Sequence, residues 1–169
     1  MATYIQIGST VTVGAGGASS IDFSSIPSTY TDLKLVLSTR SSNSSAYTAL
    51  KILYNGSSSS YTSKQLYGDG SGAFSNSYTD GWSGFVDAAT ATSNTFASSE
   101  IYIPNYASTS LQKTSSVDYV QESNGTQALS GMLGRLWANT AAITSIAITL
   151  ELGNFVQYST ASLYGIKIS

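Results

Sequence analysis

The sequence predicts an all-β protein in which two antiparallel sheets pack face to face, a sandwich with the jelly roll as its leading topology. Apolar residues recur at every second position in most segments, the period of a strand with one face on a core. Clusters of Gly, Ser, Asn and Asp separate these segments about every 10 to 15 residues. Together these observations predict about eight to ten strands, with other Greek-key sandwiches as the alternative topology.

The same alternation predicts individual strands along the chain. Short strands are expected at Val11–Val13 and Ser19–Phe23, and Asp32–Thr39 alternates Leu33, Leu35 and Leu37 with Lys34, Val36 and Ser38. The next predicted strands are Ala49–Asn55, Thr62–Tyr67, Phe96–Ile103, Ser116–Gln121 and Gln127–Trp137, with one or two more inside 73–88. Thr144–Leu152 and Ser162–Ile168 repeat the pattern at the end. Each segment is therefore expected to place one face on a core.

Two local signals qualify this prediction. Asn55-Gly56 and Asn124-Gly125 are dipeptides typical of tight hairpin turns. Leu129–Asn139 admits a short helix as an alternative, but Gly131 and Gly134 disfavour it.

The chain of 169 residues is expected to form a single domain, 1–169. Residues 1–13 are either an N-terminal arm that reaches a neighbour through Tyr4, Ile5 and Ile7, or an edge strand of the chain's own sheet. Met1–Val13 lacks the basic start of a signal peptide, and no apolar run approaches the roughly 20 residues of a membrane span, so we expect neither Sec-type export nor a membrane partner.

Composition excludes several chemistries. The chain has no His and no Cys, so thiol nucleophiles, histidine bases and zinc-thiolate sites are excluded. Only 9% of the residues are charged, and the seven Lys and Arg residues are scattered, which argues against nucleic-acid binding. The surface is expected to rely on its 52 Ser and Thr residues for hydration, which suits a protein packed in an assembly.

No motif indicates a cofactor, a metal or a catalytic site. Gly14–Gly17 is expected to be a loop, because no helix or Lys-Ser/Thr pair follows to cradle a phosphate. Gly68–Gly72 faintly resembles a calcium loop, but Asp69 stands alone, so a tight turn is predicted. Glycoside hydrolysis needs only two carboxylates, yet no two of the nine present form a recognisable pair. The chain is therefore predicted not to be an enzyme.

Aromatic residues mark the candidate contact surface. One stretch gathers rings with few aliphatic neighbours: Tyr61, Tyr67, Phe74, Tyr78, Trp82 and Phe85. Such rings anchor protein interfaces and stack on sugars, and the alternative is that they fill the core. The stretch as a whole is predicted to be a partner-contact surface.

Four phrases resemble segments that recur in virion structural proteins of tailed bacteriophages. They are Ala18–Ser42, Leu53-Tyr-Asn-Gly56, Gln65-Leu-Tyr-Gly-Asp-Gly-Ser71 and Ala161-Ser-Leu-Tyr-Gly-Ile-Lys167, in this order over nearly the whole chain. The resemblance implies a β-sandwich on the virion exterior, used as capsid decoration or as part of a tail appendage, and it carries no catalytic motif.

The expected function is that of a capsid decoration, or cement, protein that binds the outside of the shell. Its partners would be the major capsid protein or other virion proteins, and it would form a homo-oligomer, with a trimer favoured. It would assemble in the host cytoplasm and lie on the outer surface of the virion. The alternative is a tail-fibre subunit or adhesin that binds host surface glycans through the ring-rich stretch.

Overall fold

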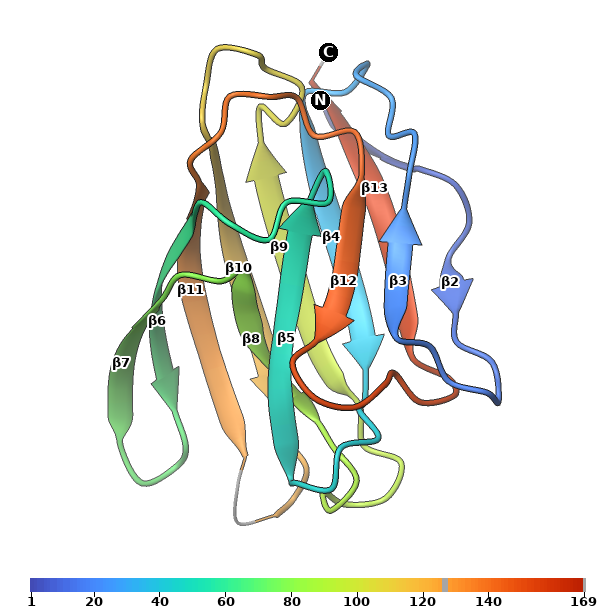
Figure 1. The fold of residues 1–169 in the computed structure, drawn as a ribbon, viewed down its shortest axis with the longest axis vertical. Helices are drawn as coiled ribbons and strands as arrows, with labels where there is room; N and C mark the ends of the chain where they lie inside the picture. Colours follow the sequence, from blue (N-terminus) through green and yellow to red (C-terminus); the bar gives the residue numbers. More distant parts are fainter. Residues whose placement is uncertain (126–127, 169) are drawn as a thin grey trace.

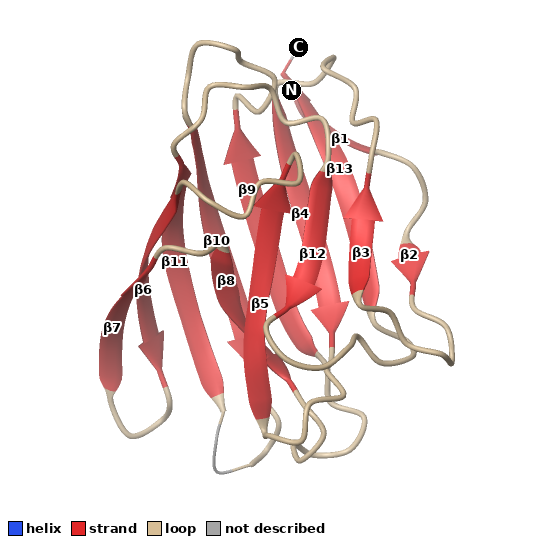
Figure 2. Ribbon diagram, in the orientation of Figure 1, coloured by secondary structure: helices blue, strands red, loops and turns tan. Residues whose placement is uncertain are grey.

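The computed structural model describes residues 1–125 and 128–168, which form two antiparallel β-sheets packed as a sandwich (Figure 1 and Figure 2). The described residues contain thirteen strands and no helix, so no helix there could cross a membrane. The predicted antiparallel β-sandwich is confirmed; the jelly-roll topology stays a prediction.

The larger sheet has nine strands and the smaller has four. The larger contains β1 (Ala2–Gln6), β2 (Val11–Thr12), β4 (Asp32–Thr39), β6 (Tyr61–Gly68), β7 (Ala73–Tyr78), β9 (Ala97–Pro104), β10 (Lys113–Gln121), β11 (Leu129–Trp137) and β13 (Thr160–Ile168). The smaller contains β3 (Ser20–Phe23), β5 (Tyr47–Tyr54), β8 (Trp82–Asp87) and β12 (Ile146–Leu150). The strand orders are β1-β13-β4-β9-β10-β11-β6-β7, with β2 also beside β13, and β3-β12-β5-β8.

Sequence alternation placed the central strands well. β4 has the predicted bounds, and Leu33, Leu35 and Leu37 are all buried between the sheets. The described residues contain thirteen strands rather than the predicted eight to ten; 73–88 holds two, within the one or two expected there, and residues 2–6 form a further strand. The core between the sheets is aliphatic with buried rings, including Tyr54, Tyr106, Trp137 and Phe155.

The structure differs from two local expectations, one between β5 and β6 and one at β11. Asn55-Gly56 has the positive φ values of a tight turn, but β5 and β6 lie in different sheets, so the predicted hairpin is wrong. The Asn55 side chain instead binds the segment before β12, through the carbonyl of Ala142 and the amide of Thr144. The helical alternative for 129–139 is also wrong, because Leu129–Trp137 pairs with both β10 and β6.

The turn at Asn124-Gly125 lies between β10 and β11, which pair antiparallel as predicted. The strand predicted to begin at Gln127 is described from Leu129, and Gln127 itself lies outside the described residues.

The two sheets differ in width. Figure 1 shows β6 and β7 at one margin of the molecule, beyond the strands of the smaller sheet. β8 ends the smaller sheet and packs against β9, β10 and β11. Gly84 of β8 allows this close approach: it has a φ of 112°, and a Cβ there would lie 2.8 Å from the ring of Tyr119.

The first and last strands are neighbours. β1 pairs antiparallel with β13, with Ala2 opposite Ile168, so both chain ends leave the same end of the sandwich (Figure 1). Of the arm-or-edge alternatives for residues 1–13, the structure contains the edge strand. Tyr4 and Ile5 are exposed, and Ile7 donates its amide to the Leu163 carbonyl.

Candidate interaction surface

The solvent-facing side of the larger sheet, the outer face, is ordered by strand register. One row of opposed residues crosses β9, β10, β11, β6 and β7 in turn: Glu100, Asp118, Met132, Leu66 and Ser75. The neighbouring row on one side is Ser98, Val120, Ser130, Gly68 and Ala73, and on the other Tyr102, Ser116, Gly134, Lys64 and Ser77. Apolar, hydroxyl and glycine positions therefore dominate this face.

Two open troughs lie side by side on the outer face. The first, of about 600 Å³, extends over Gly68 and Val120, and the second, of about 760 Å³, extends over Lys64 and Gly134. Leu66 and Met132 line both troughs and are 61% and 57% exposed. Most positions in the two neighbouring rows are Ser, Gly or Ala, so the troughs follow from the difference in side-chain size between one row and the next.

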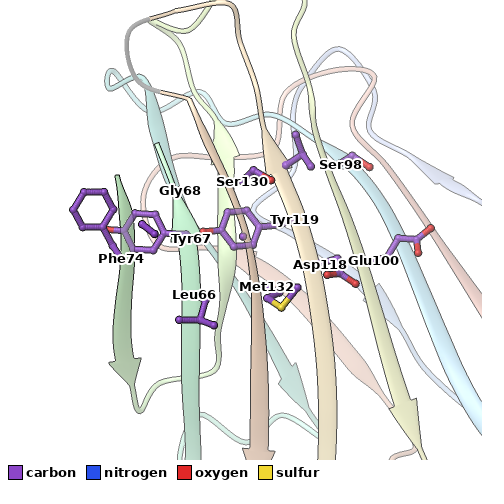
Figure 3. A pocket seen from close by; sticks show the side chains of 13 residues that line it. Leu66, Tyr67, Gly68, Phe74, Ser98, Glu100, Asp118, Tyr119, Ser130 and Met132 are labelled. Carbon is purple, nitrogen blue, oxygen red and sulfur yellow. The ribbon is translucent and has the colours of Figure 1, made fainter. Parts of the chain in front are cut away.

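Two residues that line the first trough, Tyr67 and Phe74, alternate along their strands with the outer-face residues Leu66 and Ser75, so their rings project to the other side of β6 and β7. Figure 3 shows Phe74 and Tyr67 beside one another, and their ring centres are 5.2 Å apart with 28° between the planes. Tyr67 lies opposite Gly131, where a Cβ would come within 2.8 Å of the Tyr119 hydroxyl and 2.7 Å of the Leu66 carbonyl oxygen. Glycine at 131 therefore leaves room for the Tyr119 hydroxyl and for the Tyr67 side chain, which a Cβ at this position would crowd.

The structure divides the six predicted contact residues into three groups. Tyr61 and Trp82 are buried, Tyr67, Tyr78 and Phe85 are half-buried, and Phe74 is 42% exposed. Tyr61 stacks on Trp137 inside the core, away from the trough. Trp82 stacks on Tyr78 and meets Phe85 edge-on. Of the six, Phe74 and Tyr67 line the first trough, and the function of the stretch stays a prediction.

The positive and negative charges on the outer face nearly cancel. Lys34 Nζ lies 2.7 Å from a carboxylate oxygen of Glu100, and this ion pair raises the pKa of Lys34. The Tyr102 hydroxyl donates to Asp32 at 2.6 Å, which raises the pKa of Tyr102 to about 12. Asp118 makes no ion pair with any described residue.

Three cations are buried rather than displayed. Lys113 donates through Nζ to the carbonyl oxygens of Ser108, Leu111 and Thr140, and burial lowers its pKa. Arg135 donates to the Ile52 carbonyl at 2.7 Å and lies 5.3 Å from the centre of the Tyr54 ring. Each replaces water by fixed backbone or ring partners.

The third, Arg40, binds the carbonyl oxygens of Ala91, Thr92 and Thr95. Sequence reasoning missed all three roles, because an isolated Lys or Arg in a strand is normally a surface residue.

The remaining motifs are structural. Asp69 accepts hydrogen bonds from the amides of Ser71 and Gly72, so Gly68–Gly72 is the tight turn that was predicted. The Gly17 amide donates to the Gly14 carbonyl in a loop, also as predicted. Within the described part of the chain, no three His, Cys, Asp or Glu side chains gather as metal ligands.

Comparison with known proteins gave no match among protein-family models, curated proteins or solved structures.

Proposed function

We propose that this chain is a non-enzymatic structural protein of a tailed-bacteriophage virion: a capsid decoration protein that binds the outside of the shell and stabilises it. The observation that carries the proposal is the outer face, broad, open and built from apolar and hydroxyl side chains. The four phrases that resemble phage virion proteins give it a setting. Its partners would be the major capsid protein or other virion proteins.

The form of the outer face favours a protein partner. Small-molecule sites are enclosed and bury most of their ligand, whereas both troughs are more open than enclosed. A standard protein interface buries about 800 Å² on each partner, and repeated copies over a shell multiply its effect. Leu66, Met132 and Val120, at 61%, 57% and 44% exposed, would supply the apolar contact.

The first experiment locates the protein. A quantified gel of intact particles is expected to show copies in proportion to the shell subunits. Particles stripped of the protein should also break at a lower temperature than particles that carry it. A copy number matching a single tail, with no effect on shell stability, would overturn decoration.

The second experiment tests the surface. Leu66→Asp and Met132→Asp are expected to lower occupancy on stripped particles, because a carboxylate would be buried at the contact. Leu152→Asp is the matched control, since Leu152 is also an exposed leucine, at 56%, but lies after β12 and lines neither trough. Equal occupancy for all three variants would contradict a role for the outer face.

One observation favours the alternative, a tail-fibre subunit or adhesin that binds a host surface glycan. Phe74 is 42% exposed and stacks on Tyr67, and both residues are among those that line the first trough, together with Asp118 and Ser130. Aromatic faces beside hydrogen-bonding groups suit sugars. Reproducible binding on a glycan array that is lost in Phe74→Ala would support the adhesin.

The strand pairing supports a jelly roll as the topology of the sandwich. β2 pairs with β13, β3 with β12, β4 with β9 and β5 with β8, a nested set like that of one long hairpin rolled into two sheets. The β6–β7 and β10–β11 hairpins would then be insertions that widen one sheet and form the outer-face troughs.

A further inference from the structure

Strand β7 is an open edge of the larger sheet. It ends the strand order, and among the described residues it pairs only with β6. All its residues are exposed except Tyr78, which is half-buried. The backbone donors and acceptors on its free side therefore face solvent, the arrangement to which another strand adds.

β7 lacks the features that usually block such an edge. Its sequence, Ala73-Phe-Ser-Asn-Ser-Tyr78, contains no charge and no proline. Its register against β6 runs unbroken from Ser63–Tyr78 to Gly68–Ala73, so no bulge turns the edge away. Both edges of the smaller sheet differ: β3 carries Asp22, and the pairing of β8 with β5 is interrupted by a register shift.

The sequence of β7 is also complementary to itself. If two copies pair antiparallel with Asn76 opposite Asn76, each Phe74 lies opposite Tyr78 of the second copy. Each Ser75 then lies opposite Ser77. Facing residues in an antiparallel pair project to the same side, so rings meet rings on one face and hydroxyls meet hydroxyls on the other.

We propose that two copies of this chain associate through β7, paired antiparallel about a two-fold axis at Asn76. The larger sheets of the two copies then form one continuous sheet. This pairing uses the same edge twice, so it closes as a dimer, whereas joining β1 of one copy to β7 of the next would propagate as a filament. This dimer does not depend on the proposed virion role. A trimer of the chain would need a second, different interface.

The pairing is expected to be weak in dilute solution. A six-residue strand buries less than the standard interface, so dimer formation should rise with concentration. It would be favoured wherever copies are held side by side, because the local concentration is then high.

Cysteine cross-linking tests the register, and the absence of natural cysteine makes it clean. Opposed residues in an antiparallel pair have Cα atoms about 4.5 to 5.5 Å apart, within the range of a disulfide. Asn76→Cys is expected to form a disulfide-linked dimer under mild oxidation. Ser75→Cys and Ser77→Cys should each form no disulfide-linked dimer alone, but should cross-link when the two variants are mixed. The proposal is overturned if folded Asn76→Cys forms no disulfide-linked dimer. It is also overturned if each of the three cysteine variants cross-links equally on its own.

A charge on the axis supplies a second readout. Asn76→Lys would place two ammonium groups face to face, and sedimentation is expected to show at least a tenfold weaker dimer than for the native chain. Ile5→Lys, on the opposite edge strand β1, is the matched control and should leave the dimer intact. Dissociation by Ile5→Lys but not by Asn76→Lys would place the contact at β1, and a native chain that is monomeric at millimolar concentration would also overturn the proposal. Both variants can be checked for folding by circular dichroism.

Discussion

The indole of Trp82 lies flat against the ring of Tyr78, with 4.1 Å between ring centres and 11° between the planes. Trp82 begins β8 in the smaller sheet, and Tyr78 ends β7 at the margin of the larger sheet. Phe85 and Tyr119 meet the same indole edge-on. One buried side chain therefore holds the outermost strand of one sheet against the edge of the other.

Removing this indole should loosen the fold. Trp82→Ala is expected to lower the free energy of unfolding by about 3 to 5 kcal/mol, because it deletes a buried ring and leaves a cavity. Urea denaturation measures the loss, and Trp82→Phe should recover part of it. Phe74→Ala is the control, since an exposed ring should cost far less; equal losses would contradict the packing. The adhesin hypothesis is therefore tested at Phe74, not at Trp82.

Arg40 should hold the loop of residues 88–96. Its guanidinium donates to three carbonyl groups there, one buried and two partly buried, so Arg40→Met removes three charge-assisted hydrogen bonds and is expected to cost about 3 kcal/mol. Limited proteolysis should then cut within 88–96. Lys64→Met, which removes an exposed cation bonded to Ser77, is the control and should change stability by less than about 0.5 kcal/mol. Cleavage elsewhere first would argue against this role.

Asp87 should make stability depend on pH. Burial raises its pKa, although Gln121 donates a hydrogen bond to it. A carboxyl whose pKa is higher in the folded state contributes stability at low pH that is lost as pH rises through the folded-state pKa. Native protein should therefore lose stability relative to Asp87→Asn as pH rises from about 4 to 7. Urea denaturation at each pH measures the difference in unfolding free energy between the two proteins. A difference that stays constant over this range would refute the prediction.

Tyr102 should ionise late. Its hydrogen bond to Asp32 raises its pKa to about 12, so the stability it contributes is present below about pH 10 and lost as pH rises through the folded-state value. Ultraviolet titration of the native protein is expected to show a phenol ionising near 12. The number of phenols that ionise late should fall by one in Tyr102→Phe. An unchanged number would assign the step near 12 to another tyrosine.

Attachment to particles should depend weakly on salt. Lys34 is already paired with Glu100 and three other cations are buried, so the outer face offers few charges for a partner. Contacts of apolar and hydroxyl groups are hardly screened by ions. Retention on particles is therefore expected to change little from low to molar NaCl. Steep release at moderate salt would indicate an electrostatic contact instead.

Alternation predicted the strands of the sandwich because their buried faces are aliphatic. Leu33, Leu35 and Leu37 of β4 show this plainly. It could not set the bounds of β7 within 73–88, because nearly all residues of this strand are exposed and no alternation is required. The hairpin prediction at Asn55 failed for another reason: a tight turn follows from local geometry, but the sheet to which the next strand belongs depends on distant contacts.

The candidate surface was only partly predictable. In β6 the buried face contains Gln65 while Leu66 faces solvent, and in β11 Arg135 is buried while Met132 is exposed. Polar side chains are buried there with hydrogen-bond partners on other strands, Tyr119 for Gln65 and the Ile52 carbonyl for Arg135, and sequence carries no sign of those partners. The ring-rich stretch was visible, but which rings are exposed depends on the overlap of the two sheets.

The adjacency of Ala2 and Ile168 bears on how the molecule tolerates additions. If this sandwich were inserted into a longer polypeptide, the chain would enter and leave it at the same end. The sandwich could therefore be inserted into a loop of another protein. Peptides grafted onto either terminus would emerge from that end, and a short linker would suffice to circularise the backbone.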